Sequence, residues 1–229
     1  MIWEKLRNVF DLRTKGATSY PDFYRSYLHR YVKFDPKTPI SLQSFVVLDT
    51  ETTGLDIKHD NILSIGAVRI VNNSINIADT LSIVVQNEQT QSHEAVTIHG
   101  LVQTTQKGKT PFEALIAIFE FIGSDIIVGH HIDFDITMIN KLSRTYGGSN
   151  LQNRTLDTSY LAKRLDHPSD HHNLDKKNYT LDKLCERFKI IPKARHTADG
   201  DAYITAILFM KISQQLHLRG VNSLKSLFK

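Results

Sequence analysis

Three strand patterns follow one another between residues 44 and 86, and they constrain the fold more than any other feature. The segments 44–49, 61–73 and 74–86 are rich in Val, Ile and Leu, and Gly and Asn residues separate them. Apolar runs bounded by turn-forming residues are typical of strands. Strands joined by short turns pair antiparallel. The sequence therefore predicts an antiparallel meander of three strands.

The residues after the meander alternate between helix and strand patterns. Residues 110–123 carry apolar side chains at helical spacing, 125–131 form a short apolar run, and 134–147 are again helical in pattern. A strand followed by a helix is the unit that extends a sheet with parallel strands. Three further helical patterns cover residues 156–165, 179–190 and 199–218. We therefore expect an α/β fold, with a mixed sheet of three antiparallel strands and then parallel βα units, flanked by helices.

The N-terminal segment differs from the remainder in charge. Residues 1–41 hold 8 Lys and Arg against 4 Asp and Glu, whereas residues 42–229 hold 20 of each. Two aromatic-rich helical patterns and a proline-containing linker lead us to expect a helical accessory segment over 1–41, followed by one domain over 42–229. Two roles for the segment stay open: a helical layer packed on the domain, or a basic arm that docks DNA or a protein.

The sequence contains no sign of a membrane or secretory protein. No stretch reaches the ~18 consecutive apolar residues of a membrane helix. Charged residues interrupt the N-terminus too early for a secretory signal. The one cysteine, Cys185, cannot form an intrachain disulfide. We expect a cytoplasmic protein with no membrane partner and a buried structural thiol.

The first candidate site lies where the first strand ends. Asp49 and Glu51 are two residues apart, and this spacing places both carboxylates on one face of a strand. Two carboxylates that point together repel one another unless a cation lies between them. Taken alone, the pair also fits a solvated strand end, but the apolar run before it and the Thr-Thr-Gly turn after it favour a metal site.

A third acid lies where the fourth predicted strand gives way to a helix. Asp135 is a candidate ligand, although an acid at a helix start is equally a capping residue. Asp133 competes with it for either role.

The last candidates precede the final helix. His196 and Asp201 are five residues apart, close enough to reach a single site. Because the unperturbed imidazole pKa lies near 6.5, His196 is a candidate general base at neutral pH.

The order of these candidate residues along the chain resembles that of the DEDDh superfamily of 3′→5′ exonucleases. The resemblance is greatest to its DnaQ-like branch, which includes the proofreading epsilon subunit of bacterial replicative polymerases. The resemblance covers about residues 44–215. Its three acidic motifs are DTETTGL (49–55), GHHIDFD (129–135) and HTADGDA (196–202), with landmarks at IHGL (98–101), 155–165 and 179–190.

The resemblance implies a ribonuclease H-like fold and two divalent ions, Mg²⁺ or Mn²⁺. It implies that the ions are held by Asp49, Glu51, Asp135 and Asp201, with His196 as general base. It also nominates contacts to the terminal nucleotide, from Thr50, Thr52, Leu55 and His99. One position departs from the family, because His131 stands where asparagine is frequent.

The expected function is metal-dependent 3′→5′ exonuclease activity on the 3′ end of single-stranded or frayed DNA, releasing nucleoside 5′-monophosphates. Two alternatives stay open: an RNA-trimming 3′→5′ exoribonuclease, which the same five residues support equally well, and a catalytically inactive nucleic-acid-binding subunit. A polymerase or repair protein is a possible partner through residues 1–41. Since the sequence ends at Lys229, soon after the last predicted helix, we expect a freestanding enzyme.

Overall fold

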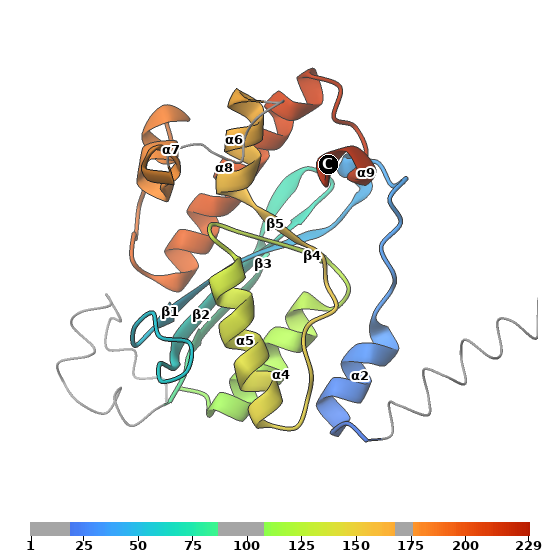
Figure 1. Ribbon diagram of the computed structural model, residues 1–229, viewed down its shortest axis with the longest axis vertical. Coiled ribbons are helices and arrows are strands. Elements are labelled where there is room, and N and C mark those ends of the chain that lie inside the picture. The colour runs from blue at the N-terminus through green and yellow to red at the C-terminus, as the bar shows by residue number, and fades with distance from the viewer. Residues whose placement is uncertain (1–18, 87–107, 168–175) are drawn as a thin grey trace, which may run out of the picture.

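The computed structural model describes residues 19–86, 108–167 and 176–229 (Figure 1). The first of the two helical patterns expected in the N-terminal segment lies outside these residues. The elements are α2 (Asp22–Arg30), η1 (Ile40–Leu42), β1 (Phe45–Thr52), β2 (Ile62–Val71), β3 (Ser74–Val84), α4 (Pro111–Ile122), β4 (Ile126–Gly129), α5 (Asp133–Thr145), β5 (Thr155–Asp157), α6 (Thr158–Asp166), η3 (Lys176–Tyr179), α7 (Leu181–Arg187), α8 (Ala198–Leu218) and α9 (Leu224–Leu227).

The strands form one sheet in the order β3-β2-β1-β4-β5. β1 pairs antiparallel with β2, which pairs antiparallel with β3, so the predicted meander is confirmed. β1 also pairs parallel with β4, which in turn pairs parallel with β5. The mixed sheet flanked by helices is therefore the predicted fold class. The three-residue strand β5 was not predicted, because so short a strand leaves no periodic pattern.

Helices cover both faces of the sheet at its central strands, whereas most residues of β3 are exposed or half-buried. Along β1, Phe45 and Val47 join one buried cluster, together with residues of α6, α7 and α8. Val46 and Leu48 join a second cluster, with residues of α2, α4 and α5. This alternation is the period of a strand, whose successive side chains point to opposite faces. In Figure 1, α8 and α6 lie on one side of the sheet and α4 and α5 on the other.

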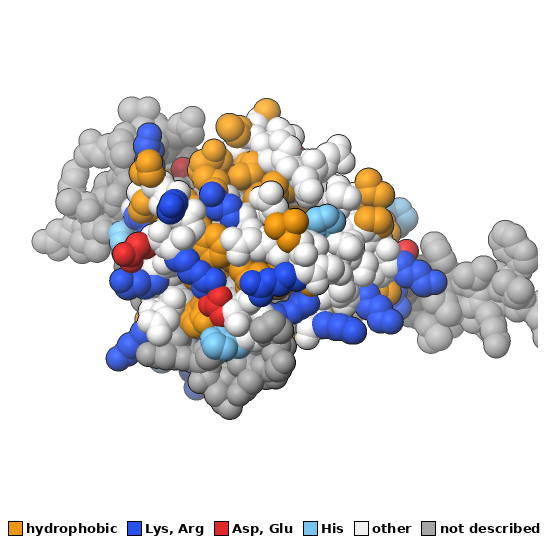
Figure 2. All heavy atoms as spheres, turned by 90° about the horizontal axis from the view of Figure 1, so that it is seen from above, with side chains coloured by type: hydrophobic (Ala, Val, Ile, Leu, Met, Phe, Trp, Pro, Cys, Tyr) orange, Lys and Arg blue, Asp and Glu red, His pale blue; other side chains and the backbone are white. Residues whose placement is uncertain are grey.

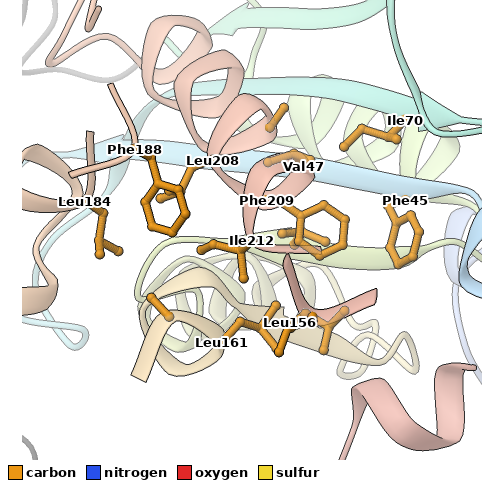
Figure 3. Close-up of a cluster of buried hydrophobic side chains, with 14 of the residues drawn as sticks. Phe45, Val47, Ile70, Leu156, Leu161, Leu184, Phe188, Leu208, Phe209 and Ile212 are labelled. Carbon is orange, nitrogen blue, oxygen red and sulfur yellow. The ribbon is translucent and has the colours of Figure 1, made fainter. Parts of the chain in front are cut away.

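The first cluster fixes α8 against β1. The ring of Phe209 in α8 lies 5.0 Å from that of Phe45 in β1, measured between centroids. Figure 3 shows these rings with Leu208 and Ile212 of the same helix and Leu161 of α6 around them. A fully buried aromatic pair of this kind contributes burial and ring contact together. α8 is therefore held firmly along the strand that carries the first acidic motif.

The second cluster includes the N-terminal helix α2. Tyr24 and Tyr27 are each 1% exposed, and their rings lie 6.0 and 5.0 Å from that of Phe119 in α4. The hydroxyl of Tyr24 donates to the carbonyl of Asn150 at 2.6 Å, and that of Tyr27 donates to Asn153 Oδ1 at 2.6 Å. α2 thus packs on α4 and the loop before β5. Whether 1–41 acts as a separate segment stays a prediction.

Gly66 of β2 lets the N-terminus of α8 rest directly on the sheet. A Cβ atom at Gly66 would lie 2.2 Å from the backbone carbon of Ala198 and the backbone nitrogen of Asp199. Gly66 pairs with Asp49 across the β1–β2 ladder. The first turn of α8 therefore lies next to the strand end that carries the acidic pair.

No helix within the described ranges combines the length and apolar character needed to cross a membrane.

Candidate active site

The alternation of β1 decides which face each residue of its acidic end occupies. Asp49 and Glu51 continue the series of Phe45 and Val47, so they point to the face that α8 covers. Thr50 lies between them and points to the opposite face, toward α5.

The structure brings three predicted acids together on the α8 face. Asp49, Glu51 and Asp201 each offer one carboxylate oxygen, and these oxygens all lie within 4.8 Å of one another. Asp201 belongs to the first turn of α8 and is 6% exposed. The contact of this turn with Gly66 carries Asp201 to the end of β1. Residues that are far apart in the sequence thus meet at the carboxyl end of one strand.

Asp135 reaches the same strand end from the other face. It lies in the first turn of α5 and is 5% exposed. Its Oδ1 accepts hydrogen bonds from the backbone N–H of Thr50 at 2.8 Å and from the Thr50 hydroxyl at 2.6 Å. Asp133, the competing acid, is exposed. Of the two acids, Asp135 is therefore the one that faces the acidic strand end.

Burial raises the pKa values of two of these acids, Asp49 and Asp135. The pKa of Asp49 lies well above its usual value because the group is buried and because Asp135, Asp201 and Glu51 surround it with negative charge. Burial raises the pKa of Asp135 to about 7, although the two hydrogen bonds from Thr50 oppose the shift. A cluster that resists ionisation in this way favours a cation among its members.

The chemistry of the site fits a divalent metal ion. Asp201 Oδ1 is buried and has no hydrogen-bond partner among the described residues. A buried carboxylate oxygen without a partner is costly unless something else satisfies it. Carboxylate oxygens are the ligands that Mg²⁺ and Mn²⁺ prefer. Asp49, Glu51 and Asp201 would supply them, with Asp135 alongside.

His196 lies on the loop between α7 and α8. Its side chain is exposed, and its backbone N–H donates to Asp201 Oδ2 at 3.2 Å. The backbone φ angles of Ala194 and His196 are 55° and 62°, so two left-handed residues turn the loop before Thr197 caps α8. The predicted base thus stands at the edge of the acidic cluster, joined through its backbone to one of the acids.

One charged residue of the site was not predicted. Arg195 donates from Nη1 to Asp201 Oδ2 and from Nε to Asp182 Oδ1, the latter at 2.7 Å. It precedes His196 in the sequence, and a cationic residue beside an acidic motif is the feature from which its role could have been predicted.

The predicted substrate contacts have different surroundings. The Thr50 hydroxyl donates to Asp135, and the Thr52 hydroxyl donates to the carbonyl of Gly54 at 2.7 Å. Leu55 is 84% exposed next to this turn. His99 lies outside the described residues. The contact of all four with substrate stays a prediction.

A partly buried histidine, His130, lies near the second acidic position in the sequence. His130 follows β4, and its Nδ1 lies 2.9 Å from the hydroxyl of Thr158, which donates to the carbonyl of Gly129 at 3.2 Å. Since a hydroxyl has one proton to donate, it accepts from an Nδ1–H of His130, and Nε2 is then the unprotonated nitrogen. Burial lowers the pKa of His130 to about 3.

The fold is shared with solved exonucleases. Escherichia coli exonuclease I in complex with a dT13 oligonucleotide superposes with a TM-score of 0.63 at 16% identity, over 78% of this chain and 42% of that one. The zinc-bound form of its complex with single-stranded DNA gives 0.62 at 18% identity, over the same shares of the two chains. The fold is therefore the ribonuclease H-like fold of the DnaQ-like exonucleases, as predicted.

The sequence comparison then gives the family. The RNase_T model, described as an exonuclease, matches residues 46–209, and the chain belongs to this family. The DNA polymerase III epsilon subunit of Aquifex aeolicus is 30% identical over 174 residues, which cover 76% of this chain and 82% of that protein. The PolC-type DNA polymerase III of Caldanaerobacter subterraneus subsp. tengcongensis is 33% identical over 184 residues, or 80% of this chain. This chain spans only 12% of that polymerase.

Proposed function

We propose that the protein is a metal-dependent 3′→5′ exonuclease that removes nucleotides from the 3′ end of single-stranded or frayed DNA and releases nucleoside 5′-monophosphates. The observation that carries the proposal is the meeting of Asp49, Glu51 and Asp201, with oxygens within 4.8 Å of one another, in a chain of the exonuclease family. Asp135 completes the set through its bonds to Thr50.

Each residue has a role that follows from its position. The four carboxylates would hold two divalent ions, Mg²⁺ or Mn²⁺, which when bound activate the attacking water and stabilise the leaving 3′ oxygen. His196 removes the proton of the attacking water, since it is exposed and its backbone N–H donates to Asp201 of the cluster. Thr50, Thr52, Leu55 and His99 contact the terminal nucleotide.

A basic strip beside the site fits a nucleic-acid strand. Residues 181–195 contain five Lys and Arg against two Asp and Glu, a net charge of +3. Lys189 and Lys193 are exposed, and neither forms an ion pair with another described residue. Figure 2 looks onto the end of the molecule where α6 and α7 lie, and Lys and Arg side chains outnumber Asp and Glu there. Such a surface attracts a phosphate backbone.

The relatives point to DNA as substrate. The A. aeolicus protein is a DNA polymerase III epsilon subunit, the C. subterraneus protein is a PolC-type DNA polymerase III, and exonuclease I was solved with a DNA oligonucleotide. RNA trimming is the second candidate function. An enzyme that acts on RNA contacts the 2′-hydroxyl group, which DNA lacks.

The decisive experiment follows a 5′-labelled strand with Mn²⁺, with Mg²⁺ and with EDTA. We expect a ladder that shortens from the 3′ end, no digestion in EDTA, and protection by a 3′-terminal phosphorothioate. Asp49→Asn and Asp201→Asn should each lose at least about 1,000-fold in rate, since removing one member of a concerted site removes most of the catalysis. Asp133→Asn is the matched control, because Asp133 is an exposed acid two residues from Asp135.

Digestion by both purified variants at the rate of the unsubstituted protein would refute the proposal. Matched single-stranded DNA, frayed duplex and RNA, compared in one time course, decide the substrate. An inactive protein that still binds DNA would instead support a binding subunit.

A further inference from the structure

Arg195 is a cation that contacts the acidic cluster. Its Nη1 donates to Oδ2 of Asp201, the same oxygen that accepts the backbone N–H of His196. Asp201 shares the cluster with Asp49 and Glu51, and one carboxylate oxygen of each lies within 4.8 Å of the others. The positive charge of Arg195 also acts on Asp49, because it opposes the rise in the pKa of that acid.

The guanidinium is fixed in this position from its other side. Nε of Arg195 donates to Asp182 Oδ1 of α7 at 2.7 Å. The Arg195 side chain is 19% exposed, whereas that of Asp182 is 65% exposed. Arg195 thus bridges an outer carboxylate on α7 and an inner one on α8. Because most of the guanidinium is withdrawn from water, its charge is screened less than that of a surface arginine.

We infer that Arg195 is the built-in counter-charge of the metal-free site, and that it competes with the divalent cation for the negative charge of Asp201. The inference rests on the proposed function, since it concerns how the same site takes its metal. By this account Arg195 is not a catalytic residue, because its charge acts through Asp201.

The physical reason is the repulsion among the acids. Carboxylates at this spacing destabilise the folded protein unless positive charge lies close to them. Arg195 supplies part of that charge, so the site can stay assembled before a cation arrives. A divalent ion held on the unpartnered Oδ1 of Asp201 would supply more, and it would then share one carboxylate with the guanidinium. Two cations on one carboxylate each weaken the binding of the other, and this coupling is reciprocal.

Two variants separate the charge of Arg195 from its shape and hydrogen bonds. Arg195→Gln keeps an amide that can donate to Asp201 but removes the charge, and Arg195→Lys keeps the charge. Asp182→Asn is the matched control, because it loosens the outer anchor and leaves the guanidinium on Asp201. Circular dichroism of each purified variant establishes that it is folded before any comparison.

The measurements are the thermal midpoint in EDTA and in saturating Mn²⁺, and the Mn²⁺ affinity from calorimetry. We expect the midpoint of Arg195→Gln in EDTA to fall by about 2–4 °C or more. In Mn²⁺ most of this difference should disappear, and the Mn²⁺ affinity should rise roughly 5-fold or more. Arg195→Lys and Asp182→Asn should stay close to the unsubstituted protein in Mn²⁺ affinity. A merely structural role would lower the midpoint equally in both conditions.

Four results would overturn the inference. Equal losses of stability in EDTA and Mn²⁺ would make Arg195 a structural residue only. Weaker Mn²⁺ binding by Arg195→Gln would mean that Arg195 orients Asp201 for the metal and does not compete with it. If the unsubstituted protein bound no Mn²⁺, both the proposed function and this inference would be wrong. If the unsubstituted protein bound Mn²⁺ and Arg195→Gln bound it with the same affinity, only this inference would be wrong.

Discussion

Asp135 and Thr50 are joined by two hydrogen bonds to one carboxylate oxygen, from the backbone N–H at 2.8 Å and from the hydroxyl at 2.6 Å. Thr50 lies between the two acids of β1, and Asp135 lies on a helix that covers the opposite face of the sheet. The pair of bonds therefore fixes the second acidic motif relative to the first without placing Asp135 on the α8 face.

Thr50→Val should slow the enzyme by removing one of these bonds. A hydrogen bond to a carboxylate contributes about 1.5–3 kcal/mol, so we expect a loss of roughly 10- to 100-fold in rate at neutral pH. The pKa of Asp135 should rise further, since the hydroxyl of Thr50 now lowers it. The activity of the variant should therefore recover partly as the pH increases. Thr50→Ser keeps the hydroxyl and is the control, and equal pH–rate profiles for all three proteins would contradict the account.

Metal binding should depend on pH because burial raises the pKa values of Asp135 and Asp49. The pKa of Asp135 is about 7, and that of Asp49 is raised as well, so bound protons must leave when a cation binds. We expect the Mn²⁺ affinity to increase between pH 6 and pH 8. Calorimetry in two buffers of different ionisation enthalpy counts the protons released, and a count of zero with a constant affinity would show this account to be wrong.

The acids of the candidate site could be selected from the sequence because they occur in recognisable local patterns. Asp49 and Glu51 end an apolar strand, and Asp135 and Asp201 each lie in the first turn of a helix. What the pattern could not give was the partner of each side chain. The bond of Asp135 to Thr50 and the bridge made by Arg195 depend on how helices sit on the sheet, and this packing leaves no mark in local sequence.

The basic strip should contribute to binding and little to chemistry. Replacing Lys189 and Lys193 together by Gln should raise KM for single-stranded DNA and leave kcat nearly unchanged, since both side chains are exposed. The logarithm of KM should also depend less steeply on the logarithm of salt concentration, with a slope smaller by about 1.4 for two lost phosphate contacts. Lys211→Gln with Lys225→Gln removes the same charge from exposed positions elsewhere. Equal KM values for the two double variants would argue against the strip.

His130 should make the protein sensitive to acid. Its pKa is about 3 in the folded state, against about 6.5 for an unperturbed histidine. Between pH 3 and pH 6.5, His130 is therefore protonated in the unfolded chain and neutral in the folded protein. The contribution of neutral His130 is therefore complete above pH 6.5 and is lost as the pH falls toward 3, by at most about 1.4 kcal/mol per pH unit. Denaturant unfolding of His130→Asn should show a shallower loss of stability over this range. His29→Asn, at an exposed position, should follow the unsubstituted protein, and parallel curves for all three would rule out the role of His130.

Gly66→Ala should damage the site through the backbone of α8. The added Cβ would lie 2.2 Å from the backbone at Ala198 and Asp199, too close for any rearrangement of a flexible side chain to relieve. The first turn of α8 must then move away from β2. This movement increases the distance between Asp201 and Asp49, which pairs with Gly66. We expect a stability loss of about 1–3 kcal/mol and a much weaker response to Mn²⁺ at temperatures where the protein is still folded. Ala67→Gly provides the comparison, because Ala67 is buried in the cluster on the opposite face. It should lose stability while keeping its metal-induced stabilisation, since nothing is added beneath α8. If Gly66→Ala kept the same metal response as Ala67→Gly, the seating of α8 on Gly66 would not be what holds Asp201 in place.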